Sequence, residues 1–252
     1  MRYAKELASR VNCSTEAATE NARLVHCLKQ RPWEELTRVD IAAPKYFSAF
    51  GPTVDQRSFL PDDVRHLMGK RTDAVFASTP LLVGVMKNEG QLFLSPQDLN
   101  EGLTEAQMKR MLRTFVRNVF NFHRQKIYDI IAYHYSDWEK PRDPYVTRDN
   151  MMEFLSDSQY AAPTIELARY HSDLEAPTYV YAFGQPSKLE AHPHWAGSVH
   201  GDDLIYVFGA PLVDGTEPFG SIYGRSEKVL AEYVLRYWTN FIKTGLVPSS
   251  RR

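Results

Sequence analysis

The sequence predicts an α/β fold, in which helices flank a mainly parallel sheet. Two segments carry the strand prediction: residues 81–86 are a continuous apolar run, and residues 178–183 are rich in β-branched and aromatic side chains. Helical periodicity before, between and after these segments completes the alternation. The 252 residues contain no internal repeat and no linker rich in Pro and Gly, so we expect one domain, residues 1–252, with no internal boundary.

Helices are predicted first along the chain. Tyr3, Leu7 and Val11 recur at helical spacing, which indicates an amphipathic helix packed on a larger body. A second helix is predicted to end at Gln30, and Pro32 suits the first position of a third. A loop-rich stretch then leads to the first strand, whose apolar run is typical of burial on both faces.

A well-marked helix is predicted in the middle of the chain. Thr104 and Gln107 have the form of a capping box at its start. Its apolar face comprises Met108, Met111, Leu112, Phe115 and Val119. Its basic stripe, which on sequence alone is more typical of a solvent-exposed face than of a binding site, comprises Lys109, Arg110, Arg113 and Arg117.

Further helices are predicted over residues 125–135 and 151–171, the latter kinked at Pro163. The last helix has Ser226 as a candidate N-cap and ends at Gly245. Its apolar stripe comprises Leu230, Val234, Trp238 and Phe241. The first residues do not form a signal peptide, and the chain stops soon after the last helix, so we expect an internal piece of a longer protein.

Composition and charge exclude several classes of protein. Lys+Arg 30 against Asp+Glu 31, with a pI of about 6.7, disfavours a nucleic-acid or anionic-membrane module. Hydrophobic residues at 43% are too many for a disordered segment. No apolar run approaches the roughly 20 residues of a membrane-spanning helix.

The cysteines bear on the cellular compartment. Cys13 and Cys27 are the only two and lie close enough in sequence for a disulfide, which would stabilise the fold by about 3 kcal/mol. Asn12 begins an N-x-S glycosylation sequon beside the first cysteine. Together these features favour an oxidising, extracellular setting, and the alternative is two unrelated buried thiols.

Two loops carry the candidate chemistry. Glu89 directly follows the strand at 81–86, and ligands of open α/β sheets bind at the carboxyl ends of strands. His200 lies between two glycines, where a histidine can face a cleft. Each residue also has a simpler interpretation, since Glu89 can be a solvated turn residue and His200 a surface histidine. We expect no cofactor and no metal site in the chain itself.

The segments around these two residues resemble the type-B carboxylesterase and cholinesterase family. The resemblance rests on residues 84–90 and 200–212, with supporting segments in family order along nearly the whole chain. It implies the C-terminal portion of an α/β-hydrolase fold, as an incomplete domain. It also implies that Glu89 is the triad acid and His200 the base, in the order in which that fold presents them, and that the two side chains meet.

The nucleophile of that triad does not occur in the chain. In this family the G-x-S-x-G elbow and the glycine-rich oxyanion loop lie upstream, and Gly197 to Gly201 has Val199 in place of the serine. We therefore expect Glu89 and His200 to be vestigial here, and the chain as given to be no enzyme.

Within the family the chain resembles the neuroligins, through residues 135–141, 155–159 and 200–211. Asn88 agrees with this, because active cholinesterases usually carry Asp before the triad acid. The resemblance implies a neurexin-like receptor as partner, with calcium held mainly on the partner's side. By position the interface would comprise Asn88, Glu89, Gly90 and Leu92. We choose Leu92 as the apolar anchor and expect its loop to present Glu89 and Leu92 outward, while the alternative places Leu92 in the core.

The resemblance also implies a homodimer of the full-length protein through a four-helix bundle. Apolar residues cover more than one face of the contributing helix: Ile127, Ile130, Ile131, Tyr133 and His134. The second contributing helix would lie beyond Arg252, so we do not expect this chain to dimerise alone.

Three hypotheses for function follow. The first is a non-catalytic adhesion domain at the extracellular, postsynaptic face of the plasma membrane. The second is a secreted serine carboxylesterase whose serine-bearing half lies outside the chain, with Glu89 orienting His200. The third is a fragment from an incomplete gene model with no function of its own. A G-x-S-x-G motif upstream would favour the second.

Overall fold

The computed structural model describes residues 2–13, 21–57, 59–69, 74–186, 193–213 and 223–247, to which the structural statements below refer. Its helices are α1 (Arg2–Arg10), α2 (Asn21–Lys29), α3 (Trp33–Thr37), α4 (Val64–Met68), α5 (Ala74–Ser78), α6 (Pro96–Glu101), α7 (Glu105–Val119), α8 (Arg124–His134), α9 (Pro144–Ser156), α10 (Ala162–Asp173), α11 (Leu204–Val207) and α12 (Arg225–Thr244). Its strands are β1 (Leu81–Met86) and β2 (Thr178–Phe183). Short 3-10 or π turns are η1 (Glu89–Phe93), η2 (Asp157–Ala161), η3 (His194–Ala196) and η4 (Ala210–Leu212).

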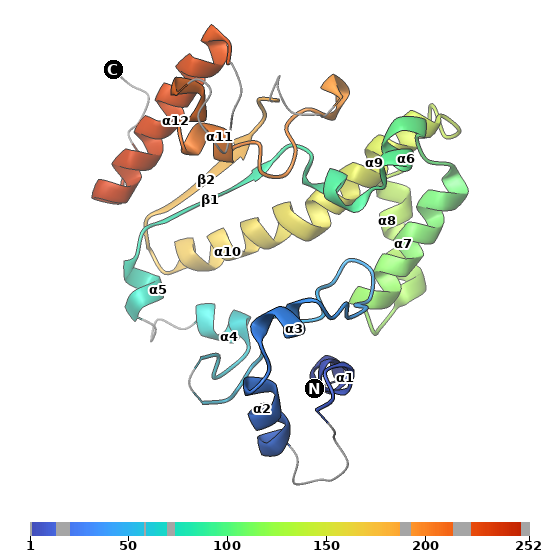
Figure 1. The fold of residues 1–252 in the computed structure, drawn as a ribbon. Coiled ribbons are helices and arrows are strands. Elements are labelled where there is room, and N and C mark those ends of the chain that lie inside the picture. Colours follow the sequence, from blue (N-terminus) through green and yellow to red (C-terminus); the bar gives the residue numbers. More distant parts are fainter. Residues whose placement is uncertain are drawn as a thin grey trace.

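The two strands form a parallel pair with helices on both sides, as the α/β prediction requires. Their register runs from Leu81 opposite Thr178 to Met86 opposite Phe183. Helix α10 lies along one face, and α11 and α12 lie on the other (Figure 1). The ring of Tyr181 on β2 packs edge-to-face on Trp238 of α12, which ties this second layer to the sheet.

The expectation that β1 is buried on both faces is wrong for this chain. Only Met86 of the strand is buried, and the other five residues are half-buried. Among the described residues β1 pairs only with β2, so its outer edge has no neighbouring strand to cover it. Gly84 leaves room for the ring of Tyr181 on the neighbouring strand, because a Cβ there would lie 2.4 Å from that ring.

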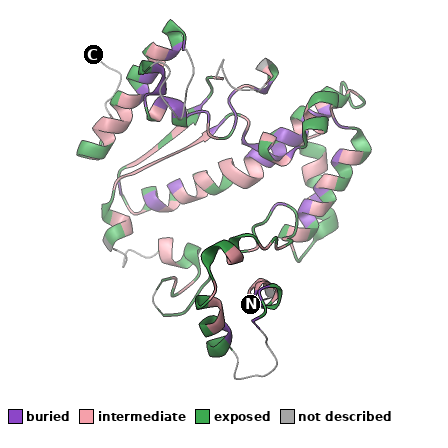
Figure 2. Ribbon diagram, viewed as in Figure 1, coloured by how far each residue is buried: buried purple, intermediate pink, exposed green. Residues whose placement is uncertain are grey.

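Three clusters of buried side chains form the core. The first is built by α7, α8 and α9 around Leu112 and Leu155, and the second joins the sheet to α11 and α12 around Tyr206. The third is small and lies between α1 and α2. Figure 2 shows the buried residues of the first two clusters close to the sheet and to α9, away from the N-terminal helices.

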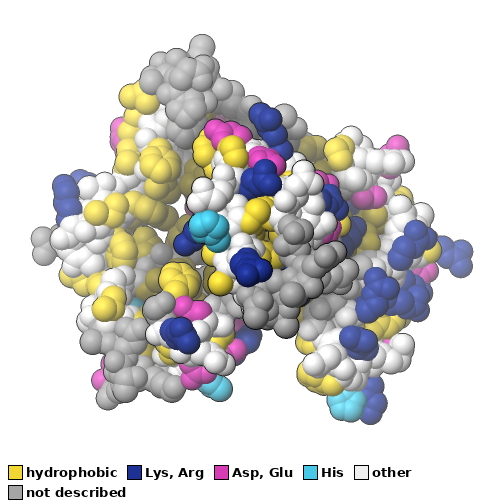
Figure 3. Space-filling model, turned by 60° about the horizontal axis from the view of Figure 1, so that its bottom comes forward, with side chains coloured by type: hydrophobic (Ala, Val, Ile, Leu, Met, Phe, Trp, Pro, Cys, Tyr) yellow, Lys and Arg dark blue, Asp and Glu magenta, His cyan; other side chains and the backbone are white. Residues whose placement is uncertain are grey.

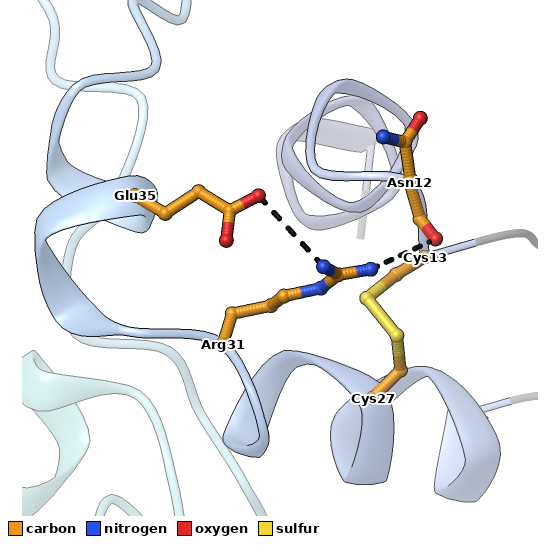
Figure 4. The surroundings of a disulfide bond; sticks show 5 residues. All are labelled: Asn12, Cys13, Cys27, Arg31 and Glu35. Atoms are coloured by element: carbon orange, nitrogen blue, oxygen red, sulfur yellow. Dashed lines mark hydrogen bonds and ion pairs between the residues drawn. A yellow bond between two sulfur atoms is a disulfide. The ribbon is translucent and has the colours of Figure 1, made fainter.

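The N-terminal helices are joined by the predicted disulfide between Cys13 and Cys27, whose Cα atoms lie 5.8 Å apart (Figure 4). Arg31 braces the bridge, because one guanidinium nitrogen donates to the carbonyl of Asn12 at 3.3 Å and another lies 3.9 Å from Glu35. Asn12 is exposed, as a glycosylation sequon requires, and has a positive φ of 55°.

Three helices begin at residues other than those predicted from the capping signals in the sequence. Ser226 lies inside α12, because Gly224 is the N-cap and its backbone N–H donates to Glu227. Pro32 precedes α3 instead of opening it. Helix α9 begins at Pro144 and is capped by Asp143. The π turn η2 lies between α9 and α10, and it accommodates Pro163, which has no backbone N–H to donate.

The short helices α4 and α5 fall in the stretch predicted as loop. The capping box of α7 is confirmed, as is the end of α12 at Gly245. Val119 is exposed, so the apolar face of α7 ends one turn earlier, at Val116.

Candidate functional site

The backbone brings the two candidate loops together beyond the carboxyl ends of the strands. After β1 the chain continues the parallel pairing, with an isolated bridge between Asn88 and Val199. The backbone N–H of Asn88 donates to the carbonyl of Ser198 at 2.9 Å, and its side-chain amide donates to the carbonyl of Ala196. The loop after β1 and the loop that carries the histidine are therefore held side by side by the sheet itself.

The buried Ser198 links the two loops to the ends of the strands through its side-chain hydroxyl. Its side chain is fully buried, and its hydroxyl donates to the carbonyl of Phe183 at 2.6 Å while accepting from the N–H of Lys87 at 3.1 Å. One hydroxyl thus links the end of β2, the end of β1 and the histidine loop. This role of Ser198 could not be predicted from the sequence, because a single serine in a loop carries no periodic signal.

Glu89 and His200 meet at this edge of the sheet, as predicted. Nδ1 of His200 lies 2.6 Å from one carboxylate oxygen of Glu89, and the other oxygen accepts from the N–H of Met86 at 2.8 Å. The Glu89 side chain is 5% exposed and that of His200 50%. Because the carboxylate engages Nδ1, it orients the ring and leaves Nε2 as the nitrogen that a proton donor or acceptor can reach.

The turn η1 that carries Glu89 is docked on α9 by a glycine. The N–H of Gly90 donates to the hydroxyl of Ser156 at 2.9 Å. A Cβ on Gly90 would lie 2.2 Å from the carbonyl oxygen of Met152, so only glycine permits this approach. The position of Glu89 is consequently fixed by a backbone contact as well as by its own hydrogen bonds.

A second contact holds the histidine loop against α9. Trp195 in η3, which leads into this loop, lies under the guanidinium of Arg148, 3.4 Å from the ring centroid. Arg148 is almost fully buried, donates to the carbonyl of Leu99 at 2.8 Å and pairs with Asp149 at 2.8 Å. This stack therefore joins α9 to the segment that leads into the histidine loop.

Tyr160 is a further residue of the site that the sequence did not reveal. Its ring centroid lies 5.1 Å from that of His200, and it stands on the π turn η2. Burial raises the pKa of the Tyr160 phenol, and the carboxylate of Glu89 raises it further. A π turn shifts side chains off the helical period, so the helical pattern did not place Tyr160 at the sheet edge.

The loop residues predicted to contact a partner are divided between surface and interior. Leu92 is 60% exposed, so the alternative that placed it in the core is wrong. Asn88 is half-buried, and Glu89 and Gly90 are buried. The expectation that Glu89 points outward is therefore wrong, because both of its oxygens have partners inside the fold.

The helix α8 presents part of its predicted apolar surface to solvent. Ile130 and Tyr133 are 69% and 70% exposed, and His134 is exposed as well. Ile127 and Ile131 instead pack against the chain's own core. The outward surface continues into the loop after α8, where Trp138 is exposed and its ring centroid lies 5.3 Å from that of Tyr133.

The described part of the chain holds neither a cluster of metal-ligating side chains nor a helix that could span a membrane. No three His, Cys, Asp or Glu side chains there are grouped so that they could hold a metal ion. None of the helices described combines the length and apolar character needed to cross a bilayer.

A family model and several curated proteins match nearly the whole chain. The model of the carboxylesterase family matches residues 1–251. Neuroligin-2 of Homo sapiens is 32% identical over 248 residues, covering 97% of this chain and 29% of the relative. Neuroligin-3 of Mus musculus is 31% identical with the same coverage, and Neuroligin-1 of Caenorhabditis elegans is 32% identical, covering 97% of this chain and 32% of the relative. The chain thus spans about a third or less of the length of these relatives.

Proposed function

The chain belongs to the carboxylesterase family, with part of an α/β-hydrolase fold, and from that premise we propose that it serves as a non-catalytic adhesion domain resembling neuroligins. In this proposal it is part of a longer protein displayed on the extracellular, postsynaptic face of the plasma membrane. Its partner is a neurexin-type receptor. The similarity to neuroligins over 97% of the chain supports this class of partner.

The observation that carries the proposal is that Leu92 is exposed on the turn η1, whose backbone is anchored on both sides. Leu92 lies in η1, whose backbone is anchored on α9 through Gly90 and on the histidine loop through Asn88. An apolar residue whose backbone is fixed before binding loses less conformational entropy when a partner covers it. Such a side chain is suited to be the central anchor of an interface.

In this proposal the partner contributes most of the charged and polar groups of the interface. Glu89 and Gly90 are buried, so they support the loop and do not touch the receptor directly. In the proposal calcium is held by residues of the partner, and the half-buried Asn88 stands at the edge of the contact.

The test measures binding of the full-length protein to an immobilised neurexin ectodomain, with calcium and with a chelator. We expect Leu92→Ala to weaken binding about 30-fold, the effect of a hot spot of about 2 kcal/mol. Leu246→Ala is the matched control, because Leu246 is also an exposed leucine and lies after α12. Binding that is indifferent to Leu92→Ala, or to the chelator, contradicts the proposed interface.

Dimerisation of the full-length protein is proposed through α8. Ile130, Tyr133 and Trp138 form one exposed apolar surface in the described part of the chain. Burial of such a surface against a second copy removes it from water.

A second candidate function is ester hydrolysis, and the intact pair of Glu89 and His200 favours it. The geometry supplies a base that is oriented by a carboxylate and is half-exposed, which is what a serine nucleophile requires. The serine and the oxyanion donors would have to come from outside this chain. Labelling of the full-length protein by a fluorophosphonate serine-hydrolase probe, lost in a His200→Ala variant, would favour the esterase over the adhesion domain.

A further inference from the structure

A single buried tyrosine ties the long segment between α2 and the sheet to the core. Among the described residues between Leu24 and Met86, only Tyr46 is buried. Large apolar side chains of the same segment, such as Trp33 and Phe50, are exposed. The side of the molecule on which the N-terminal helices lie comes forward in Figure 3, where hydrophobic side chains are scattered among charged ones. Tyr46 is thus the one side chain by which the described part of this segment enters the core.

The backbone at Tyr46 has a conformation that favours glycine, although the residue is large. The N–H of Phe47 donates to the carbonyl of Pro44 at 3.0 Å, which closes a turn with Tyr46 at its third position. The φ of Tyr46 is 73°, in the left-handed region that glycine or asparagine normally supplies in such a turn. A bulky residue in this conformation is strained, and the strain persists only where the surroundings over-determine it. The packing of the Tyr46 ring must therefore offset this strain.

The ring of Tyr46 contacts both the turn η1 and the helix α7. Its centroid lies 6.0 Å from that of Phe93, the last residue of η1, in an edge-to-face arrangement, and 5.7 Å from that of Phe115 on α7. Asn118 on α7 donates to the carbonyl of Lys45 at 3.1 Å and holds the turn that carries the tyrosine. A segment distant in sequence is therefore fixed on α7 and reaches η1 through one aromatic ring.

We propose that Tyr46 is a positioning residue for η1 and thereby for the exposed Leu92. The beginning of η1 is held on α9 by the N–H of Gly90, and its end is held by the contact of Phe93 with Tyr46, with Leu92 between the two. The inference rests on the proposed function for the role of Leu92 in binding a receptor. The contact between Tyr46 and Phe93 does not depend on what covers Leu92.

The experiment compares leucine substitutions of two equally buried tyrosines. Tyr46 and Tyr128 are 8% and 7% exposed and belong to the same core cluster, but Tyr128 packs beside α7, where Arg113 lies over its ring. Hydrogen exchange is measured by mass spectrometry on the full-length protein without a receptor. We expect Tyr46→Leu to speed exchange in η1 about fivefold, the effect of one lost aromatic pair. Tyr128→Leu is expected to leave exchange in η1 unchanged.

Two further variants separate positioning by the ring from a general loss of stability. Tyr46→Phe keeps the ring and removes a hydroxyl that has no hydrogen-bond partner among the described residues, so exchange in η1 should match that of the unsubstituted protein. Phe93→Leu removes the same ring contact and leaves the turn at 44–47 intact, so it carries the test if Tyr46→Leu does not fold. Adding Tyr46→Leu to Phe93→Leu should speed exchange in η1 no further, because the contact is already lost.

Receptor binding is measured separately, on the immobilised neurexin ectodomain. We expect Tyr46→Leu to weaken binding about threefold, because a turn that is held less firmly loses more conformational entropy on binding, and Tyr46→Phe to restore it. Unchanged exchange in η1 of Tyr46→Leu, equal acceleration by Tyr128→Leu, or receptor binding undiminished by Tyr46→Leu would overturn the proposal. If the unsubstituted protein binds no receptor while exchange responds as expected, the proposed function fails and the positioning of η1 by Tyr46 stands.

Discussion

At the scale of single residues, the candidate site is organised by groups that satisfy one another inside the fold. Glu89 divides its two oxygens between the N–H of Met86 and the ring of His200. Ser198 divides its hydroxyl between two strand ends. Since a buried polar group without a partner costs about 1–3 kcal/mol, each contact stabilises the fold as well as shaping the site.

Gly90 gives a sharp test of the docking of η1. A Gly90→Ala methyl would lie 2.2 Å from the carbonyl of Met152, so we expect the free energy of unfolding to fall by about 1–3 kcal/mol, measured by urea denaturation. Gly184→Ala is the matched control, because nothing lies within 4 Å of its Cβ, and it should leave stability nearly unchanged. Equal effects of the two substitutions would show that η1 is not packed as described.

Tyr206 predicts a dependence of stability on alkaline pH. Burial raises the pKa of its phenol to about 12 from the ordinary 10, with further contributions from Glu227 and Asp202. The folded state therefore holds the proton more tightly than the unfolded state, and the stability from this group is complete below pH 10 and is lost as pH rises from 10 to 12.

Tyr206→Phe removes this titration. The Tyr206 hydroxyl is buried and has no hydrogen-bond partner among the described residues, so we expect the substitution to leave stability at pH 7 unchanged or to raise it. Between pH 10 and 12 the variant should lose less stability than the unsubstituted protein in urea denaturation. Parallel losses in both proteins would contradict the assignment.

At the scale of elements, the N-terminal helices form a unit with its own small core. α1 and α2 are joined by the disulfide and pack around Leu24 and Val11. Among the described residues, its contacts with the segment that follows include the donation from Arg10 to the carbonyl of Asp40 and the edge-to-face contact of Tyr3 with Phe50. Such a unit is expected to open before the sheet does.

Removal of the disulfide between Cys13 and Cys27 tests whether α1 and α2 open separately from the sheet. We expect a Cys13→Ser/Cys27→Ser variant to destabilise α1 and α2 by about 3 kcal/mol, because the loop entropy of the opened state is restored. Hydrogen exchange should therefore speed up in α1 and α2 and stay unchanged in β1 and β2. Reduction of the native protein is the control and should reproduce the pattern, whereas faster exchange in the strands would reject an independent unit.

At the scale of the whole molecule, the proposed dimer makes a distinct prediction. In the full-length protein Ile130→Asp places a charge in the exposed surface of α8 and should shift the sedimentation of the protein from dimer to monomer. Ile242→Asp on α12 is the control, because that isoleucine is also strongly exposed, and it should leave the dimer intact. A dimer that survives Ile130→Asp would place the interface elsewhere.

The sequence predicted those parts of the molecule that depend on local pattern. Both strands have the predicted bounds, and the end of β1 located Glu89. His200 was singled out by its flanking glycines, and its contact with Glu89 was implied by the family resemblance. Features that depend on contacts between distant segments were not predicted, among them the Ser198 hydrogen bonds and the placement of Tyr160 on a π turn. The inward orientation of Glu89 is of the same kind, because it is set by the N–H of Met86 and the ring of His200 together.

The hydroxyl of Ser198 makes the alignment of the acid–histidine pair depend on the folding of the sheet end. It closes the end of the sheet, and in doing so it fixes the spacing of an acid and an imidazole that it does not touch. The contacts that hold the end of the sheet together therefore also keep the acid and the imidazole aligned, with or without a nucleophile beside them. A serine brought to Nε2 of His200 by another part of the protein would meet a ring that is already oriented.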